Sequence, residues 1–567
     1  MLHRSQAFLR DEKKDPNSIM KQQTPLLREN LDRLDLFLKQ ERSILLATLT
    51  YAIAVGVFSL VIPLTVQELV NTFAFAISPV MVATIVGIMA GILIFVGIFK
   101  VLQFYATDIL ERRVFVRVTL ALARVLPRYK DATFQSDAIS RFFETVFLQR
   151  AFSSLFVDLT NVVIGGLIGM TLLALYHPYF VIFDMVLIGS IILIGMLGKG
   201  GLRATLHMSE SKYDVFHWFQ EVADNLLHFK TTNCSDLVLR NADTLATTYV
   251  EARQSRFRVL LRQYIGSLTL QVILHTGLLG TAGWLLSRGE LTLGQLVAAE
   301  VIVASLLLNI DSVVKRTYVM FYFLTALTEL NHLFTLPQDK ASSDSDLSIS
   351  DSGTAGLHLV CSQIGWAKSV RAIPEEIRFE AMPSEKWALI CPTETARHRV
   401  SLALAGLEAP SNGIVQYNGI DLRNLPTEQI NARRSIVFGR DLTLFEGSVS
   451  DNITMGRTGI QTEDLLWALH AAQFDKEIEE FADGLDTMVQ EGGKDFTPSQ
   501  RLRILLARAI ITRPGLLILD GGMHEVPHQI RESILHYLGS KEDPWTLVIV
   551  TTDEQIKDYV EKSLTLA

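Results

Sequence analysis

The sequence predicts two parts: an all-α membrane domain of six helices, followed by an α/β domain. Three observations support this prediction. Hydrophobic residues make up 49% of the 567 residues, and the mean hydropathy is +0.28. Long runs without any charged side chain lie before Leu336. After Leu336, strand-like and helical segments alternate, which is typical of a largely parallel sheet flanked by helices.

The membrane helices are predicted from four runs that contain no Asp, Glu, Lys or Arg: Ile44–Gln67, Leu69–Phe99, Leu159–Phe183 and Gln263–Ser287. A bilayer core about 30 Å thick needs about 20 apolar helical residues, so each run is long enough for at least one span. Short turns near Asn71–Pro79, at Tyr176–Pro178 and at Ser287–Glu290 would divide the region into three helix pairs. The later pairs are expected at Phe152–Leu175 with Tyr179–Leu197, and at Tyr264–Leu286 with about Leu296–Tyr318.

The charge distribution predicts orientation and excludes some functions. Lys and Arg gather in the segments before the first helix and after the second and fourth helices, whereas the outer turns contain only Arg288. The positive-inside rule therefore places both termini in the cytoplasm. The net charge of −8 argues against nucleic-acid binding. Cys234, Cys361 and Cys391 are too few and too scattered for a disulfide framework or a zinc site, and no metal site is expected.

Changes in composition predict the boundaries of four regions. Residues 1–40 form a polar N-terminal segment, 41–336 the six-helix domain, 337–356 a Ser/Asp/Gly-rich linker and 357–567 the α/β domain. The inner loops, 100–151 and 199–262, have a helical pattern and are interpreted as helical extensions. Strands are expected at Trp387–Ile390, Ser435–Phe438, Leu516–Leu519 and Thr546–Val550.

Motifs in the last part resemble a known family. Gly515–Asp520, preceded by Gln500–Ile510, resembles the Walker B strand and signature helix of an ATP-binding cassette. Further similar segments are Leu444–Ile453, Ser411–Asp421, Gln490–Gly493 and, before the sixth helix, Gly289–Leu296. The chain thus resembles an ABC exporter half-transporter: a six-helix exporter domain followed by a P-loop NTPase-like cassette. The membrane half looks closest to bacterial exporters of the peptide and type I secretion kind.

The P-loop departs from the family pattern. G-x-x-x-x-G-K-[ST] lets backbone N–H groups hold phosphates, while Lys reaches their oxygens and the hydroxyl holds Mg²⁺. At this place Cys391 and Ala396 replace the glycines, so a positive φ there would cost about 1–2 kcal/mol. Glu394 brings a carboxylate toward a polyphosphate, and Arg397 replaces a compact ammonium by a planar fork. His398 is a poor Mg²⁺ ligand.

Other nucleotide-site positions also depart from the family pattern. Asp520 is retained in Walker B, but Gly521 stands where the resemblance implies the general base, Thr552 where it implies the switch His, and Arg440 where it implies the Q-loop Gln. Loss of a general base costs about 10²–10⁴ in rate. Trp366 falls where this family places an aromatic that stacks on adenine, and ordinary packing is equally compatible with it.

The signature is altered too. Where the family has L-S-G-G-Q, this chain has Phe496, Thr497, Pro498, Ser499 and Gln500. Pro498 removes a backbone N–H at a helix start that should face a phosphate, while the two hydroxyls retain the capacity for weak phosphate contact. The sequence therefore predicts a degenerate, pseudo-ATPase cassette with no catalytic residues, whose ATP hydrolysis is weak or absent and whose cofactor is at most weakly bound ATP and Mg²⁺.

The resemblance implies partners and a location. A second half-transporter, either another copy or an intact ABC sibling, is expected, and the analogy adds a periplasmic membrane-fusion adaptor and lipid. The expected location is the bacterial inner membrane. Two alternatives remain: an active ATP-driven exporter of a peptide, protein or lipid-like substrate, and a membrane scaffold that transports nothing. Asp184 and Glu300 are candidates for a transport pathway, or they reach interfacial water.

Overall fold

The structure, a computed structural model, describes residues 39, 41–75, 79–130, 136–232, 234–339, 356–366, 376–440, 442–521, 523–540 and 543–566. The chain folds into two compact units. The first, which we call the helical unit, comprises Met1–Pro127 and Phe134–Leu336. The second, the α/β unit, comprises Arg128–Thr133 and Pro337–Ala567.

The helical unit contains six helices long and apolar enough to cross a membrane within the described residues, which confirms the six-helix prediction. Its helices are α3 (Arg42–Ser59), α4 (Val61–Phe75), α5 (Pro79–Val125), α6 (Glu144–Tyr176), α7 (Tyr179–Leu197), α8 (Gly201–Asp224), α9 (Leu226–Thr231), α10 (Ser235–Ser287) and α11 (Leu293–Phe334), with a 3₁₀ helix at Ser136–Phe143. The predicted outer turns at His177 and Arg288 end α6 and α10.

Several helices are far longer than a bilayer is thick. The helices α5 and α10 have 47 and 53 residues, which at 1.5 Å per residue correspond to about 70 and 80 Å. A bilayer core spans only about 30 Å, so both helices extend well beyond it. The prediction of helical extensions is therefore confirmed for the parts of 100–151 and 199–262 that lie in α5, α6, α8, α9 and α10. Leu126–Arg128 and Ser136–Phe143 are 3₁₀ helices instead, and 131–135 and 233 lie outside the described residues.

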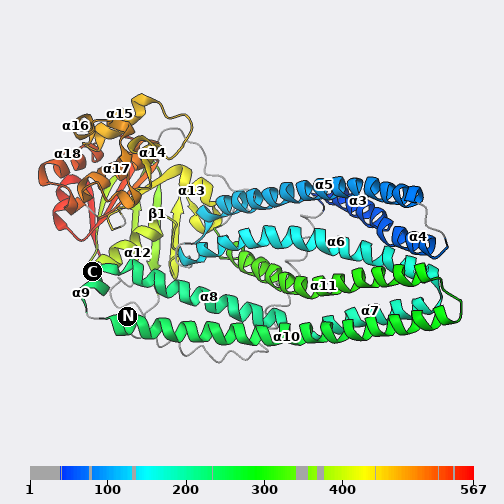
Figure 1. The fold of residues 1–567 in the computed structure, drawn as a ribbon. Coiled ribbons are helices and arrows are strands. Elements are labelled where there is room, and N and C mark those ends of the chain that lie inside the picture. Colours follow the sequence, from blue (N-terminus) through cyan, green and yellow to red (C-terminus); the bar gives the residue numbers. More distant parts are fainter. Residues whose placement is uncertain are drawn as a thin grey trace. The chain divides into compact units, whose positions relative to one another are not determined.

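The helix α11 lies at the centre of the helical unit. Figure 1 shows α6, α10 and α11 running alongside one another, and α11 packs against both neighbours. Thr292 and Gln295 form a capping box that begins α11. In α6, Gly169 permits a close approach, because a Cβ there would lie 3.3 Å from the Leu306 side chain.

The α/β unit is built on a parallel sheet in the order β11-β3-β10-β9-β6. Its strands are β3 (Lys386–Ile390), β6 (Arg434–Phe438), β9 (Leu516–Asp520), β10 (Thr546–Thr551) and β11 (Lys562–Thr565). All four predicted strands are present. The central strands β9 and β10 are buried at every residue, which explains their unbroken apolar runs.

A second, antiparallel sheet has the order β2-β1-β4-β5. Its strands are β1 (Leu359–Gly365), β2 (Ile377–Ala381), β4 (Asn412–Tyr417) and β5 (Ile420–Asp421), and a separate pair consists of β7 (Gly447–Ser448) and β8 (Met488–Val489). The helices of this unit are α12 (Glu394–Leu404), α13 (Thr427–Arg433), α14 (Val449–Thr454), α15 (Thr462–Ala471), α16 (Asp475–Glu480), α17 (Pro498–Ile510) and α18 (His528–Leu538).

Candidate functional site

Three predicted site segments meet at one edge of the parallel sheet. The strands β3, β10 and β9 are neighbours, and Cys391, Thr552 and Gly521 directly follow their carboxyl ends. This edge is where ligands bind in open α/β sheets. The sheet therefore brings together residues that are far apart in the sequence.

The loop between β3 and α12 is short, and the backbone N–H groups in and after it donate hydrogen bonds within the protein. Only Cys391–Thr393 separate the two elements. Thr393 caps α12, because its side-chain oxygen accepts from the N–H of Ala396 and its carbonyl accepts from the N–H of Arg397. The Cys391 N–H donates to the Thr551 carbonyl over 2.7 Å. These three N–H groups, at the place of a phosphate cradle, are thus already bonded within the protein.

The backbone strain expected at the replaced glycines does not occur. Neither Cys391 nor Ala396 has a positive φ. Ala396 lies inside α12, where any L-residue is accommodated. The cost of about 1–2 kcal/mol that a positive φ would carry at these two residues therefore does not arise.

Arg397 is buried beside Asp520. The side chain is 3% exposed and donates to the Asp520 carbonyl, with a further Nη1–Oδ1 ion pair of 3.1 Å to the same residue. Its Nη2 donates to Glu394 over 2.6 Å. The guanidinium also lies against Gly521, since a Cβ built there would be 2.5 Å from Arg397 Cζ. A side chain on residue 521 would therefore displace the Arg397 guanidinium.

Asp520 is fully buried and fully engaged. Its two carboxylate oxygens contact Arg397, His398 and Ser401, with His398 Nδ1 at 2.9 Å and Ser401 Oγ at 3.0 Å. Sequence reasoning missed Ser401, although its position one turn after Arg397 is a usable signal. No cluster of three His, Cys, Asp or Glu residues suited to a metal ion occurs in the described ranges. A magnesium ion would have to displace these contacts.

Glu394 joins the remaining altered positions. Its Oε1 accepts from the Thr552 hydroxyl over 3.1 Å, and its Oε2 pairs with Arg397 and lies 3.6 Å from Arg440 Nη2. Partial burial acts to raise the pKa of Glu394, but Arg397, the Thr552 hydroxyl and Arg440 outweigh it and lower that pKa. Glu394 is therefore held as a carboxylate beside the two cations Arg397 and Arg440.

Cys391 and Trp366, two other predicted site residues, are both packed into the hydrophobic core of the α/β unit. Burial raises the pKa of the Cys391 thiol to about 12, so the thiol stays protonated and unreactive. Trp366 is half-buried and packs against the hydrophobic core that contains Cys391 and Ala396. Both observations fit packing roles.

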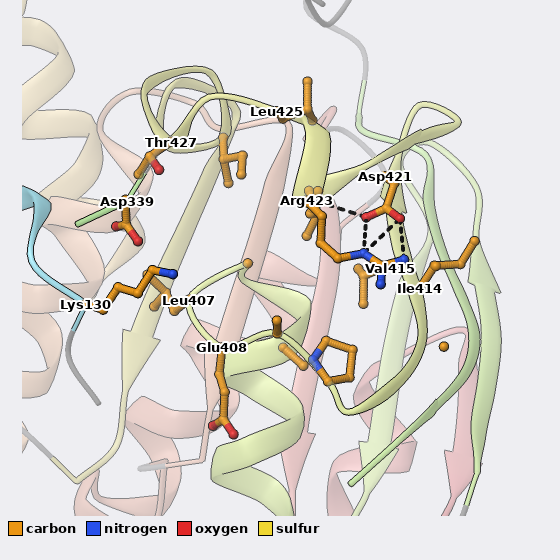
Figure 2. Close-up of a pocket in the computed structure, with 17 residues that line it drawn as sticks. Lys130, Asp339, Leu407, Glu408, Ile414, Val415, Asp421, Arg423, Leu425 and Thr427 are labelled. Carbon is orange, nitrogen blue, oxygen red and sulfur yellow. Dashed lines mark hydrogen bonds and ion pairs between the residues drawn. The ribbon is translucent and has the colours of Figure 1, made fainter. Parts of the chain in front are cut away.

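The space left beside this network is modest. A cavity of about 310 Å³ is lined by Glu394, Arg397, Gly521, Thr552 and neighbours from β10 and from the segments that follow β9 and β10. A second hollow, of about 460 Å³, lies at the opposite end of α12. Figure 2 shows Asp421 bonded to Arg423 in its wall, and none of the predicted nucleotide-site residues lines it.

The altered signature forms a self-contained helix start. Thr497 is the N-cap of α17: its hydroxyl accepts from the Gln500 N–H, and the Gln500 side chain accepts from the Thr497 N–H. Pro498 occupies the first turn, where a missing N–H is tolerated. Phe496 is buried against Phe481, and Ser499 Oγ is buried without a partner among the described residues. The Thr497 hydroxyl is thus committed to capping.

The two predicted membrane carboxylates have separate surroundings. Glu300 on α11 lies 3.2 Å from His275 Nδ1 on α10. Asp184 on α7 is buried, and its Oδ1 has no hydrogen-bond partner in the part of the chain that the structure describes. No ion pair or hydrogen bond within those residues joins Asp184 to Glu300.

Comparison with known families matches the α/β unit. The ABC transporter family model matches residues 376–523. The chain is 23% identical over 299 residues to the mycobactin import ATP-binding/permease protein IrtB of Mycolicibacterium thermoresistibile, covering 52% of this chain and 50% of that protein. It is also 23% identical over 275 residues to the probable multidrug resistance ABC transporter ATP-binding/permease protein YheI of Bacillus subtilis, covering 48% and 46%. The matched region spans about half the length of these curated relatives.

The likeness to a solved structure extends over nearly the whole chain. A bacterial Atm1-family ABC exporter with ATP bound superimposes with a TM-score of 0.81, at 16% sequence identity. The match covers 93% of this chain and 94% of that one. At this identity, the likeness shows a shared fold.

Proposed function

Because the chain has the fold of an ABC exporter half-transporter, with six candidate membrane helices and an ABC transporter cassette, we propose that it is a subunit of an export system whose own cassette hydrolyses little or no ATP. The observation that carries this proposal is the buried Arg397 guanidinium, which occupies the space between Asp520, Glu394 and Gly521. A phosphate and its Mg²⁺ would need the same atoms. The protein thus supplies its own counter-ions at the site.

The assembly follows from the incompleteness of one half-transporter. In this family each composite nucleotide site joins the P-loop and Walker B of one chain to the signature of another. A second half-transporter, either another copy or an intact ABC sibling, is therefore part of the proposal. The self-capped start of α17 at Thr497 would offer a partner's nucleotide few free donors. A bacterial inner-membrane location with both termini cytoplasmic, and a periplasmic adaptor, complete the proposal.

A second candidate function is supported by the family match. The ABC transporter model extends over residues 376–523, which include both the P-loop position and Asp520. An active ATP-driven exporter would require Arg397 to leave Asp520 when nucleotide binds. The two candidates differ in whether this cassette turns over ATP.

Phosphate release separates the two candidates. The full chain, purified in nanodiscs, would be incubated with Mg-ATP with and without orthovanadate. We expect no vanadate-sensitive phosphate release from this chain alone. Release that vanadate abolishes, in a preparation free of other ABC proteins by mass spectrometry, would favour the active exporter. A pull-down from native membranes that recovers an intact ABC sibling would support the heteromeric form.

A further inference from the structure

The helical unit contains a pocket of about 520 Å³ between α6, α8, α10 and α11. It is lined mainly by Phe147, Arg150, Lys212, Tyr249, Tyr318 and Tyr322. On α6 and α10 the lining residues precede the charge-free runs that begin at Leu159 and Gln263. The pocket thus lies on the polar extensions of the helices, and its volume is typical of a small-molecule site.

One wall of the pocket is a fixed aromatic surface. The rings of Tyr318 and Tyr322 are 4.7 Å apart at an interplanar angle of 72°. The buried guanidinium of Arg256 lies 4.5 and 4.7 Å from the two ring centroids and donates to both hydroxyls. This contact holds the rings in place and puts a positive charge behind them.

The remaining charge in the pocket is also positive. Lys212 is neutralised by Glu144, which also accepts from Tyr213 over 2.7 Å. Arg150 is exposed and has no ion pair within the described ranges. Thr325 also lines the pocket, and its hydroxyl is buried without a partner among the described residues. A ligand oxygen would satisfy Thr325, whose unmet hydrogen bond is unfavourable.

We propose that this pocket binds an amphiphilic anion. Its flat apolar body would pack on Tyr318, Tyr322 and Phe147, and its carboxylate, sulfonate or phosphate would pair with Arg150. Aromatic cages also bind cations, but here Arg256 already supplies a cation to both tyrosine rings from behind, and the free charge is positive. The proposal rests on the helical unit alone and is independent of ATP hydrolysis. The anion could be a soluble molecule or a lipid headgroup.

The test is photolabelling of the full chain in neutral phosphatidylcholine nanodiscs with 4-benzoylbenzoate, an aromatic carboxylate. Mass spectrometry should find the label in the peptides that contain Phe147–Ser154 and Tyr318–Thr325, and 2-naphthalenesulfonate should compete with it. Arg150→Gln should reduce this labelling about tenfold, because a charge-assisted hydrogen bond is lost. Arg253→Gln, which removes an exposed arginine on α10 outside the pocket, should leave it unchanged.

The lipid composition distinguishes the two sources. If phosphatidylglycerol in the nanodiscs suppresses the labelling, an anionic headgroup is the occupant; if it does not, the occupant is a soluble anion, and both results support the site. Equal labelling by the neutral 4-methylbenzophenone at the same peptides would overturn the proposal. So would unchanged labelling of a folded Arg150→Gln variant.

Discussion

The guanidinium of Arg397 occupies the space that a side chain on Gly521 would need. Residue 521 has a φ of +61°, and a Cβ there would lie 2.5 Å from Arg397 Cζ. In this arrangement, a side chain on residue 521 and the Arg397 guanidinium over Asp520 would compete for the same space. This coupling explains why restoring one position alone should fail.

The variant Gly521→Glu should gain no ATP hydrolysis and should lower the melting temperature by several degrees. The left-handed backbone adds about 1–2 kcal/mol for any L-residue, and the clash with Arg397 adds to it. Gly456→Glu is the matched control, because Gly456 has a φ of +66° but open space around it. If Gly521→Glu is no less stable than Gly456→Glu, the packing of Arg397 against residue 521 is wrong.

The double variant Arg397→Lys/Gly521→Glu should recover part of that stability loss. Lysine replaces the planar fork by a slimmer ammonium that can withdraw from residue 521. Differential scanning fluorimetry on the full chain would measure the coupling between the two changes. Strictly additive losses would contradict direct contact between the two residues.

Thr497→Ala should destabilise the cassette by about 1 kcal/mol, because α17 loses its N-cap. Thr497→Ser retains a hydroxyl and should be near neutral. Urea unfolding monitored by intrinsic fluorescence would compare the two variants. Equal stability of Thr497→Ala and the natural chain would show that the hydroxyl is free for another role.

Acidification should remove the stabilisation that the Glu394 carboxylate gives to the folded state. Its folded pKa lies below the ordinary 4.5, so the folded state favours the carboxylate. The resulting stabilisation is complete above that ordinary value and is lost as the pH falls through the folded pKa. The difference in melting temperature between the natural chain and Glu394→Gln should therefore shrink below about pH 4.5. A pH-independent difference would contradict the ion-paired geometry.

Lys386 should affect the pH dependence of stability at alkaline pH, because its pKa is lowered by burial. Burial lowers its pKa to about 8, although its Nζ donates to the Asp543 and Trp545 carbonyls. Between pH 8 and 10.5, the unfolded chain retains a proton that the folded chain has released, so stability rises with pH relative to Lys386→Met. A flat difference between the two proteins across this range would contradict a buried, depressed lysine.

The sequence predicts the parts of this fold that depend on local patterns. Charge-free runs predicted the membrane helices. Unbroken apolar runs predicted β9 and β10, because a strand that is buried on both faces has apolar residues throughout. The contact between Arg397 and Asp520 joins residues 123 positions apart and exists only once the sheet has formed. The contact between Ser401 and Asp520 was missed for the same reason. The pocket at Tyr318 likewise requires four helices to pack together.

The central claim is that this cassette does not bind nucleotide tightly. Its most direct test is an isothermal calorimetric titration of the purified full chain with Mg-ATP. The account predicts no saturable binding up to about 1 mM, because Arg397, Glu394 and Asp520 already satisfy one another. Saturable binding with micromolar affinity would show that this network opens for nucleotide and would contradict the account.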